Sequence, residues 1–524
     1  MSSKSTFSSS YASVVDEKEK NPFPDRLTLG NWKPRKGQVL TFLAWLIHGL
    51  PAAAEFTFDQ YEIVTGTAYS QTVLPGYFLG GEMAEIAVVS IDENDDRSLQ
   101  IYTFDDGTWV PIVSTTLRPE VLFIDVANIG GHDRLIMYER GRLNWLDPDL
   151  ATQHLLVEVT SMYNAPLRGD IPHVDVTRDL NGDGRDDLVV PDFDGYSVFV
   201  QLSEGAFADP VKIGPSAEMG MTVESQPWYQ ARPFHELDYN RDGRSDLVFW
   251  NEDHFEVHRQ DEHGLFASVA STSTPAVAFD TDGLYSISFG DGNNGEDDKQ
   301  KVLHSLRDLN GDDVADLVTL SLEGGSLFGM QSAYEVHFGK SIVDGVTVFP
   351  AEADTAIRSD GIQFEMKQQD FDNDGQVDIM VTSFEFGIAT IIRALLMGST
   401  SLDLEFYRME DSVYPDKPNV TRKITAEFDF STGEVFYPSV LIADLNGDGH
   451  SDLLVQENRE ELRIFVGVPG PGLFSRRPQK VAVAMPDDEE YTWLVDLNKD
   501  GRQDILMHHR STTQPHRVTM LIAR

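Results

Sequence analysis

A ten-residue acidic segment recurs along the chain, and this repeat restricts the fold more than any other feature. Its clearest copy is DLNGDGRDDL, from Asp179 to Leu188, which places acidic or amide side chains at alternate positions and includes two glycines. Two weaker copies precede it, at 77–89 and 125–135, and five further copies begin at later aspartates: Asp238, Asp308, Asp370, Asp444 and Asp496. Eight copies about 50 to 75 residues apart indicate one structural unit per copy.

Each copy is flanked by segments with the character of β-strands. At Asp444, the apolar run VLIA precedes the copy and DLLVQEN follows it. A third alternating segment, ELRIFVG, and a Gly-Leu-Phe turn into a fourth segment complete the unit. Period-2 apolar patterning and β-branched residues indicate strands. Four antiparallel strands per unit, repeated radially, predict an all-β fold: a β-propeller of four-stranded antiparallel blades.

The repeats also predict the blade number and the closure of the ring. Eight blades is the direct count, and seven is the alternative if the first weak copy is not a full blade. The last unit supplies too few strands after its acidic segment, so the extra strand EFTFDQYEIV at 55–64 is expected to complete it. One stretch departs from the pattern: residues 386–399 show helical apolar spacing, which predicts a small helical insertion packed on the propeller.

The acidic segments are candidate metal sites. Oxygen donors at positions 1, 3, 5 and 9, with the backbone carbonyl of position 7, resemble the first half of an EF-hand loop, where a glycine at position 6 permits the sharp turn. The chain has no cysteine, and an all-oxygen donor set favours Ca²⁺ over Zn²⁺. We predict about six Ca²⁺ sites, whose ligands at positions 1, 3, 5, 7 and 9 are Asp179, Asn181, Asp183, Arg185 and Asp187; Asp238, Asn240, Asp242, Arg244 and Asp246; Asp308, Asn310, Asp312, Val314 and Asp316; Asp370, Asp372, Asp374, Gln376 and Asp378; Asp444, Asn446, Asp448, His450 and Asp452; and Asp496, Asn498, Asp500, Arg502 and Asp504.

Composition agrees with this hypothesis. The chain has 86 Asp and Glu residues against 41 Lys and Arg, a formal net charge of −45. Positions 1, 3, 5 and 9 of the six loops hold 19 carboxylates, which bound cations would offset. The alternative is a set of Asx-turns that bind no metal. Asp313 replaces the position-6 glycine in the Asp308 copy and is expected to weaken binding there, and the copy at 125–135 is expected to bind no ion because its acidic residues are out of register.

The N-terminal residues have the features of an export signal. Residues 1–36 are rich in Ser and charge; they are predicted to be a disordered leader, or to lie ahead of the true translation start. The basic flank ends at Lys36, an apolar run covers 39–50, and small residues at 52–54 precede a cleavage site. We therefore predict a signal peptide at 37–54, the propeller at 55–524, and a secreted, periplasmic or cell-surface location. A buried N-terminal helix is the alternative.

The repeated units resemble FG-GAP repeats of the VCBS kind, the propeller found in integrin α-subunit heads and in many exported bacterial proteins. The resemblance rests on the acidic segments and on the Gly-Ala-Phe and Gly-Leu-Phe turns, at 205–207, 264–266 and 472–474. It covers nearly all of 55–524 and implies calcium loops on one rim, between the first two strands of each blade. It implies little about activity, because such propellers serve many roles.

Function is predicted less sharply than fold. The acidic charge argues against nucleic-acid partners. The apolar run at 39–50 is too short to span a bilayer and no other stretch approaches that length, so no transmembrane segment is expected after signal cleavage. No GxSxG motif, complete zincin motif or complete P-loop occurs. The first hypothesis is a monomeric, non-enzymatic binding or scaffold module for an unknown protein or a cell-surface glycan. The alternatives are a polysaccharide lyase or hydrolase, which needs a local basic pocket, and a structural component of an envelope assembly.

Overall fold

The computed structural model describes the chain from Phe56 to Arg524. Residues in this range that lie outside the description are 148–151, 164–168, 204, 222–226, 280–298, 324–330, 341, 344–345, 360–361, 385–389, 391–396, 430–433 and 512–513. The chain divides into two units, Met1–Ala53 and Ala54–Arg524, and the first lies outside the described residues. The predicted signal peptide at 37–54 and most of the helical insertion at 386–399 therefore fall outside the part of the chain that the structure describes.

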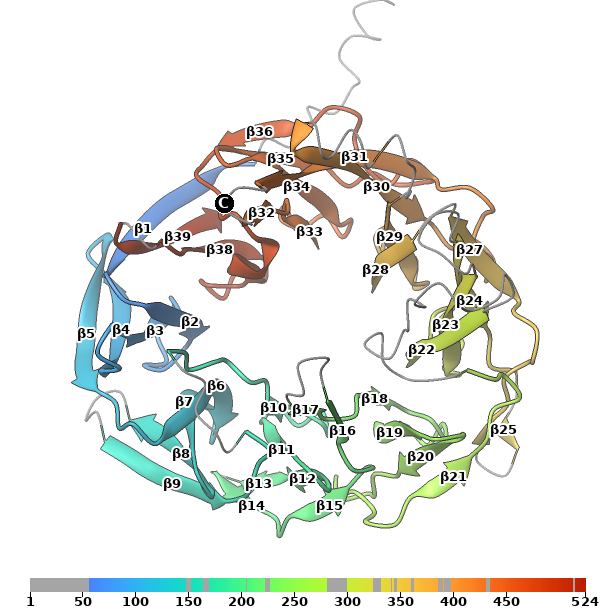
Figure 1. Cartoon of the computed structure of the whole chain (residues 1–524), viewed down its shortest axis with the longest axis horizontal. Coiled ribbons are helices and arrows are strands. Elements are labelled where there is room, and N and C mark those ends of the chain that lie inside the picture. Colours follow the sequence, from blue (N-terminus) through green and yellow to red (C-terminus); the bar gives the residue numbers. More distant parts are fainter. Residues whose placement is uncertain are drawn as a thin grey trace, which may run out of the picture. The chain divides into compact units, whose positions relative to one another are not determined.

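The second unit is an eight-bladed β-propeller of antiparallel sheets (Figure 1). The first four blades are β2 (Ser70–Gly76), β3 (Glu85–Ile91), β4 (Arg97–Asp105) and β5 (Thr108–Thr116); β6 (Val121–Ile129), β7 (His132–Glu139), β8 (Arg142–Asp147) and β9 (Thr152–Glu158); β10 (Thr177–Arg178), β11 (Asp187–Asp192), β12 (Gly195–Phe199) and β15 (Val211–Ile213); and β18 (Phe234–Leu237), β19 (Asp246–Asn251), β20 (His254–His258) and β21 (Ser271–Ser273). The prediction of an all-β propeller is confirmed.

The remaining four blades complete the ring. They are β22 (Lys299–Arg307), β23 (Asp316–Glu323), β24 (Gln331–His337) and β27 (Thr355–Ser359); β28 (Ile362–Gln369), β29 (Asp378–Phe384), β30 (Ser399–Tyr407), β31 (Val420–Asp429) and β32 (Glu434–Phe436); β33 (Val440–Ala443), β34 (Asp452–Asn458), β35 (Glu461–Phe465) and β36 (Gln479–Ala482); and β37 (Thr492–Val495), β38 (Asp504–His509), β39 (His516–Ala523) and β1 (Phe58–Gly66). The first weak copy lies in a full blade, so the count of eight is confirmed.

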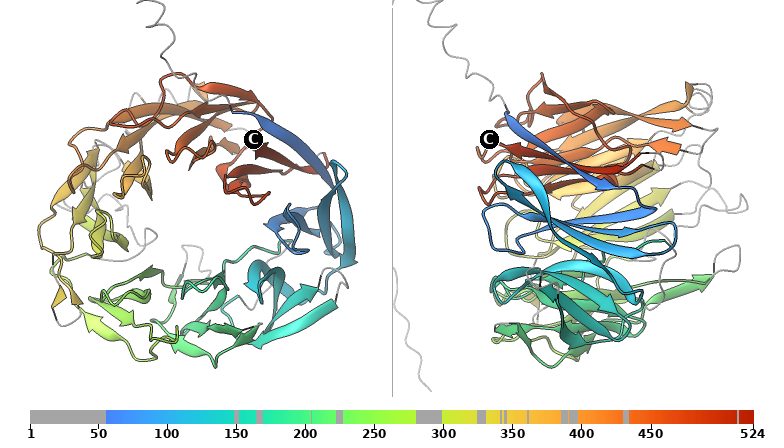
Figure 2. Two further views of the ribbon diagram at one scale, coloured as in Figure 1. Left: turned by 180° about the vertical axis from the view of Figure 1, so that it is seen from behind. Right: turned by 90° about the vertical axis from the view of Figure 1, so that its left-hand side faces the viewer.

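The ring closes through its two ends. β1 pairs antiparallel with β39 from Phe58 opposite Ala523 to Gly66 opposite His516, and Figure 1 shows these two strands side by side near the C-terminus. The predicted closing strand is therefore confirmed. Figure 2 shows the strands of the blades running from one face of the ring to the other. Successive strands reverse direction, so the turn between a blade's first and second strands lies at the opposite end from the turn between its second and third.

The core lies between neighbouring blades. In the fourth blade, Leu247 to Trp250 of β19 are all buried, because a second strand faces apolar layers on both sides. One apolar cluster joins the sixth and seventh blades through Met380, Leu404 and Leu453, and another joins the eighth to the first. These shared layers stabilise the blades as one ring.

Short additions decorate the ring. The predicted Gly-Ala-Phe turn forms the hairpin β13 (Gln201–Ser203) and β14 (Ala206–Phe207). Two further hairpins are β16 (Glu218–Met221) with β17 (Pro227–Gln230), and β25 (Ile342–Val343) with β26 (Val346–Thr347). A 3-10 turn, η2 (Glu489–Tyr491), leads into β37. The part of the chain that the structure describes contains no helix that could span a bilayer.

Candidate metal loops

The six acidic segments form six equivalent loops, each joining the first strand of a blade to the second. They connect β10 to β11, β18 to β19, β22 to β23, β28 to β29, β33 to β34 and β37 to β38. In every loop the position-9 aspartate is the first residue of the second strand. All thirty predicted ligand residues therefore lie in these loops, at the same end of the third to eighth blades.

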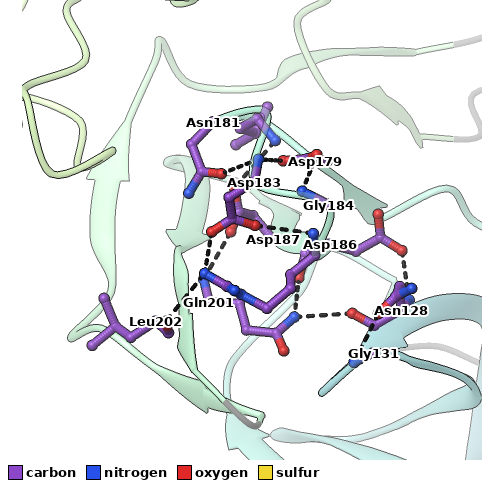
Figure 3. Close-up of polar contacts among 12 residues, drawn as sticks. Asn128, Gly131, Asp179, Asn181, Asp183, Gly184, Asp186, Asp187, Gln201 and Leu202 are labelled. Carbon is purple, nitrogen blue, oxygen red and sulfur yellow. Dashed lines mark hydrogen bonds and ion pairs between the residues drawn. The ribbon is translucent and has the colours of Figure 1, made fainter.

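A repeated hydrogen-bond frame shapes each loop. In the third blade, Asp179 Oδ1 accepts from the backbone N–H of Asp183 at 3.0 Å, and Oδ2 accepts from that of Gly184 at 2.8 Å (Figure 3). Asp183 Oδ1 accepts in turn from the N–H of Arg185 at 2.9 Å. The bonds from position 6 to position 1 and from position 7 to position 5 recur in the other five loops. Through these bonds, each frame holds the carboxylates of positions 1 and 5 within one small loop.

The Asp308 loop keeps this frame although it lacks the usual glycine. Asp313 has a φ of +60°, where Gly184 has +80°. Its N–H donates to Asp308 Oδ2 at 2.8 Å, as the glycine does elsewhere. Aspartate tolerates the left-handed region better than most residues, so the substitution is accommodated without loss of the turn.

Position 9 is buried, and both of its carboxylate oxygens accept hydrogen bonds. The six aspartates Asp187, Asp246, Asp316, Asp378, Asp452 and Asp504 are all fully buried. In five loops, Oδ2 accepts from the position-2 N–H, and Oδ1 accepts from an N–H that follows or ends the third strand. In the fourth blade, Asp246 Oδ2 accepts instead from the Asn240 side chain. Position 9 thus closes the loop onto its own blade.

Burial also changes the acidity of position 9. Desolvation raises the pKa of Asp187 to about 7; its two backbone hydrogen bonds lower this pKa, and the nearby Asp183 and Asp179 carboxylates raise it. The pKa values of Asp316 and Asp378 rise to about 7 for the same reasons. A bound cation would favour the ionised form of each.

The Asp370 loop fits a divalent cation most directly. It holds one carboxylate more than each of the other loops, because Asp372 stands where they have asparagine. Ligand oxygens of Asp370, Asp372 and Asp374 lie within 4.8 Å of one another. Asp372 is buried, and its Oδ1 has no hydrogen-bond partner among the described residues. An unpartnered buried carboxylate oxygen beside two further carboxylates suits a hard cation such as Ca²⁺.

An arginine from outside the repeat lies on this loop. Arg408 follows β30; its Nε contacts Asp372 Oδ2 and its Nη2 donates to Asp374 Oδ2 at 2.8 Å. In three other loops the position-7 arginine pairs with the position-5 carboxylate, as Arg244 does with Asp242 at 2.6 Å. The sequence repeat predicted a role only for the carbonyl of position 7, and gave no signal for Arg408, which lies 38 residues after Asp370.

The two weak copies differ from each other. In the second blade, β6 and β7 form a tight hairpin across Gly130 and Gly131, and Asp125 lies within β6, where its Oδ2 accepts from the Val176 N–H at 2.8 Å. In the first blade a loop remains between β2 and β3. Its position-9 residue is Glu85, which is buried and accepts from the Leu79 N–H at 3.0 Å.

The loops also contact one another around the rim. The N–H of position 8 donates to the position-2 carbonyl of the preceding blade: Val377 to Leu309 at 2.7 Å, Ser451 to Phe371 at 2.8 Å and Ala84 to Leu497 at 2.8 Å. A change in the shape of one loop can therefore affect its neighbour directly.

Comparison with known proteins agrees with this geometry. The model of the FG-GAP-like repeat matches residues 444–507, which run from the acidic loop of the seventh blade into β38, the second strand of the eighth. The chain carries an FG-GAP-like repeat. This FG-GAP-like repeat contains two of the six acidic loops, and the other four share its hydrogen-bond frame.

Two solved structures are similar to the chain at low sequence identity. The V. cholerae biofilm matrix protein Bap1 is similar at 11% identity over 89% of this chain and 91% of that chain, with a TM-score of 0.37. Saccharomyces cerevisiae Sqt1 is similar at 9% identity over 89% of this chain and 98% of that one, with a TM-score of 0.37. No curated protein matches the chain.

Proposed function

We propose that the protein is an exported calcium-binding β-propeller that acts as a non-enzymatic binding or scaffold module for a protein or a cell-surface glycan. The observation that carries the calcium part is the group of Asp370, Asp372 and Asp374 oxygens within 4.8 Å, in a loop whose frame recurs in five others. Asp370, Asp372 and Asp374, with their counterparts in the other loops, would hold the ions. A bound Ca²⁺ would supply positive charge that offsets the repulsion among these carboxylates.

The chain's own residues explain what calcium would stabilise. Positions 1, 5 and 6 already form the turn through hydrogen bonds, and position 9 fixes the turn to the third strand. The cost that remains is electrostatic, because like charges lie close together in each loop. An ion that binds the folded loops only would stabilise them by RT ln(1 + [L]/Kd), which is about 4 kcal/mol per site at a thousandfold excess over Kd.

The calcium part is tested by titration calorimetry on chelator-treated protein. We expect heat from Ca²⁺ with about six sites, a smaller response to Mg²⁺, and a lower melting temperature in EGTA. The double variant Asp179→Asn/Asp183→Asn should remove one site. Its matched control is Asp105→Asn/Asp106→Asn, which removes two exposed carboxylates from a hairpin turn of the first blade. No heat and an unchanged melting temperature in EGTA would contradict the calcium proposal.

Export and partner binding need separate tests. The basic flank, apolar run and small residues at 33–54 support export, which mass spectrometry of the mature N-terminus tests; a chain that still begins before Gly37 would contradict it. Exposed Met219, Met221, Trp228 and Tyr229 on the β16–β17 hairpin support a binding role, because such side chains are enriched in interfaces. Binding to an arrayed glycan or an isolated protein without turnover would support the module. Product formation from the bound glycan would show an enzyme instead.

A further inference from the structure

A pocket of about 840 Å³ lies at the closing blade of the ring, at the end where Gly66 of β1 pairs with His516 of β39. We call it the seam pocket and define it by Arg459, Tyr491, His508, Arg510, His516 and Arg517. Arg459 comes from the turn between β34 and β35, Tyr491 precedes β37, and the other four lie at the adjoining ends of β38 and β39. Its volume is within the usual range for small-molecule sites.

The seam pocket lies away from the acidic loops. Asp504, in the loop of the same blade, begins β38, whereas His508 and His509 end that strand. A strand rises about 3.3 Å per residue, so the two ends of β38 are roughly 15 Å apart. The pocket therefore belongs to the opposite end of the blade and is separate from the candidate calcium sites.

The arginines give the seam pocket an unusual charge for this chain. Acidic residues outnumber basic ones by 86 to 41 overall, yet three arginines line the pocket beside only two carboxylates, Asp487 and Asp488. Arg459 pairs with Asp487 at 2.5 Å, and Arg517 pairs with Glu62 at 3.1 Å. Asp488 is engaged as the cap of η2.

Arg510 differs from the other two arginines. It is exposed, its guanidinium lies 5.1 Å from the centroid of the Tyr491 ring, and it donates to the Tyr491 hydroxyl. Among the described residues it forms no ion pair. A guanidinium held against an aromatic ring is fixed in orientation and keeps donors for a planar anionic group.

Two buried histidines are among the residues that line the same pocket. The rings of His508 and His516 stack with centroids 5.9 Å apart, and both residues are buried. His508 Nε2 and His516 Nδ1 have no hydrogen-bond partner among the described residues. Burial lowers the pKa of His508 to about 3, so this ring is neutral at physiological pH. Buried polar atoms without partners are uncommon and indicate a missing partner, such as a ligand or a water.

We propose that the seam pocket binds the acidic group, a carboxylate or a phosphate, of a sugar-sized polar molecule. Arg510, which has no carboxylate partner among the described residues, provides the positive charge, and the Tyr491 hydroxyl and the pocket carboxylates can meet hydroxyl groups of the ligand. The site goes beyond the calcium-binding function and does not depend on it. Carboxylate and phosphate share the chemistry that a guanidinium recognises, and the experiment separates them.

The experiment uses the full mature protein, which is first loaded with calcium and then separated from unbound calcium. Glucuronate, glucose 6-phosphate and neutral glucose are titrated separately by calorimetry. We expect one of the two acids to bind and glucose not to bind, and the acid that binds identifies the group. Arg510→Gln should weaken binding about tenfold or more, which corresponds to roughly 1.4 kcal/mol.

The matched control is Arg476→Gln. Arg476 is also exposed, and it lies between β35 and β36, at the end of its blade that carries the acidic loops. Its replacement removes the same charge and should leave the affinity within about twofold of the original. Equal losses in the two variants, equal binding of glucose, or no binding of either acid at millimolar concentration would overturn the proposal. Unchanged melting of Arg510→Gln would show that its loss of binding is not a loss of fold.

Discussion

The loop of the first blade and the six acidic loops share one feature and differ in another. All seven place a buried carboxylate at the first residue of the second strand, Glu85 in the first blade and Asp452 in the seventh, for example. Six of these carboxylates accept a hydrogen bond from a backbone N–H of their loop, as Glu85 does from Leu79 and Asp452 from Leu445, and Asp246 accepts instead from the Asn240 side chain of its loop. The first-blade loop has Tyr77, Leu79 and Gly81 where the others have ligands at positions 1, 3 and 5.

This difference separates two roles that the acidic loops combine. Position 9 is retained where the candidate ligands are lost, so its primary task is to hold the loop on the blade. Positions 1, 3 and 5 carry the candidate cation ligands, and they are what distinguishes the six acidic loops from the first-blade loop. The six loops are therefore structural turns to which ion binding is added.

The largest expected effect comes from removing position 9. Asp452→Ala leaves the N–H groups of Leu445 and Gly467 without their acceptor, and each unsatisfied buried group costs about 1–3 kcal/mol. We expect the free energy of unfolding to fall by roughly 2–4 kcal/mol with EGTA present, because the loss does not involve an ion. Denaturant unfolding monitored by tryptophan fluorescence measures it.

The matched variant is Asp448→Ala at position 5 of the same loop. Asp448 is exposed, and its frame bond to the His450 N–H faces solvent. This variant should melt like the original chain in EGTA and lose stabilisation only when calcium is added. If Asp452→Ala were also harmless in EGTA, position 9 would be a ligand alone and the comparison of the two kinds of loop would fail.

Much of the fold follows from the sequence because the repeat is local. Each acidic segment lies between two of its own blade's strands, so eight copies predict eight blades, and the unpaired strand at 55–64 predicts the closure that β1 makes with β39. The candidate ligands could be predicted from the sequence for the same reason, since all five positions of a loop lie within nine residues. The calcium assignment itself stays a prediction.

What the sequence did not predict involves residues far apart in the chain. Arg408 reaches Asp372 from the end of another strand, and the seam pocket combines Arg459 with residues near the C-terminus. Glu85 was not recognised as a position-9 residue because the surrounding ligands are missing. The second-blade copy became a hairpin because Gly130 and Gly131, with φ of +64° and +84°, allow a two-residue turn.

A second contrast lies within the six loops and concerns Arg408. Its guanidinium contacts the carboxylates of Asp372 and Asp374, which are candidate ligands, so it competes with an incoming cation. Arg408→Gln should therefore raise the calcium affinity of the Asp370 loop, by about tenfold if removal of the competitor is worth 1.4 kcal/mol. Titration against a chromophoric chelator measures the affinity. Arg502→Gln, which removes a pair with the single carboxylate of Asp500, should have a smaller effect, and weaker binding in Arg408→Gln would show that the arginine supports the loaded loop.

The smallest effect concerns the charge of Glu85. Burial raises the pKa of Glu85 above its usual value, and the Leu79 and Thr103 hydrogen bonds only partly offset this. A carboxyl whose pKa is higher in the folded than in the unfolded chain binds its proton more tightly when folded; its contribution to stability is complete below the unfolded pKa and is lost as pH rises through the folded pKa. Glu85→Gln keeps an acceptor for the Leu79 N–H without the charge. It should raise the melting temperature by about 1 °C at neutral pH and leave it unchanged at pH values below the unfolded pKa, with or without calcium. A shift that appeared only with calcium would place Glu85 among the ion-dependent residues, and would remove the distinction between the first-blade loop and the other six.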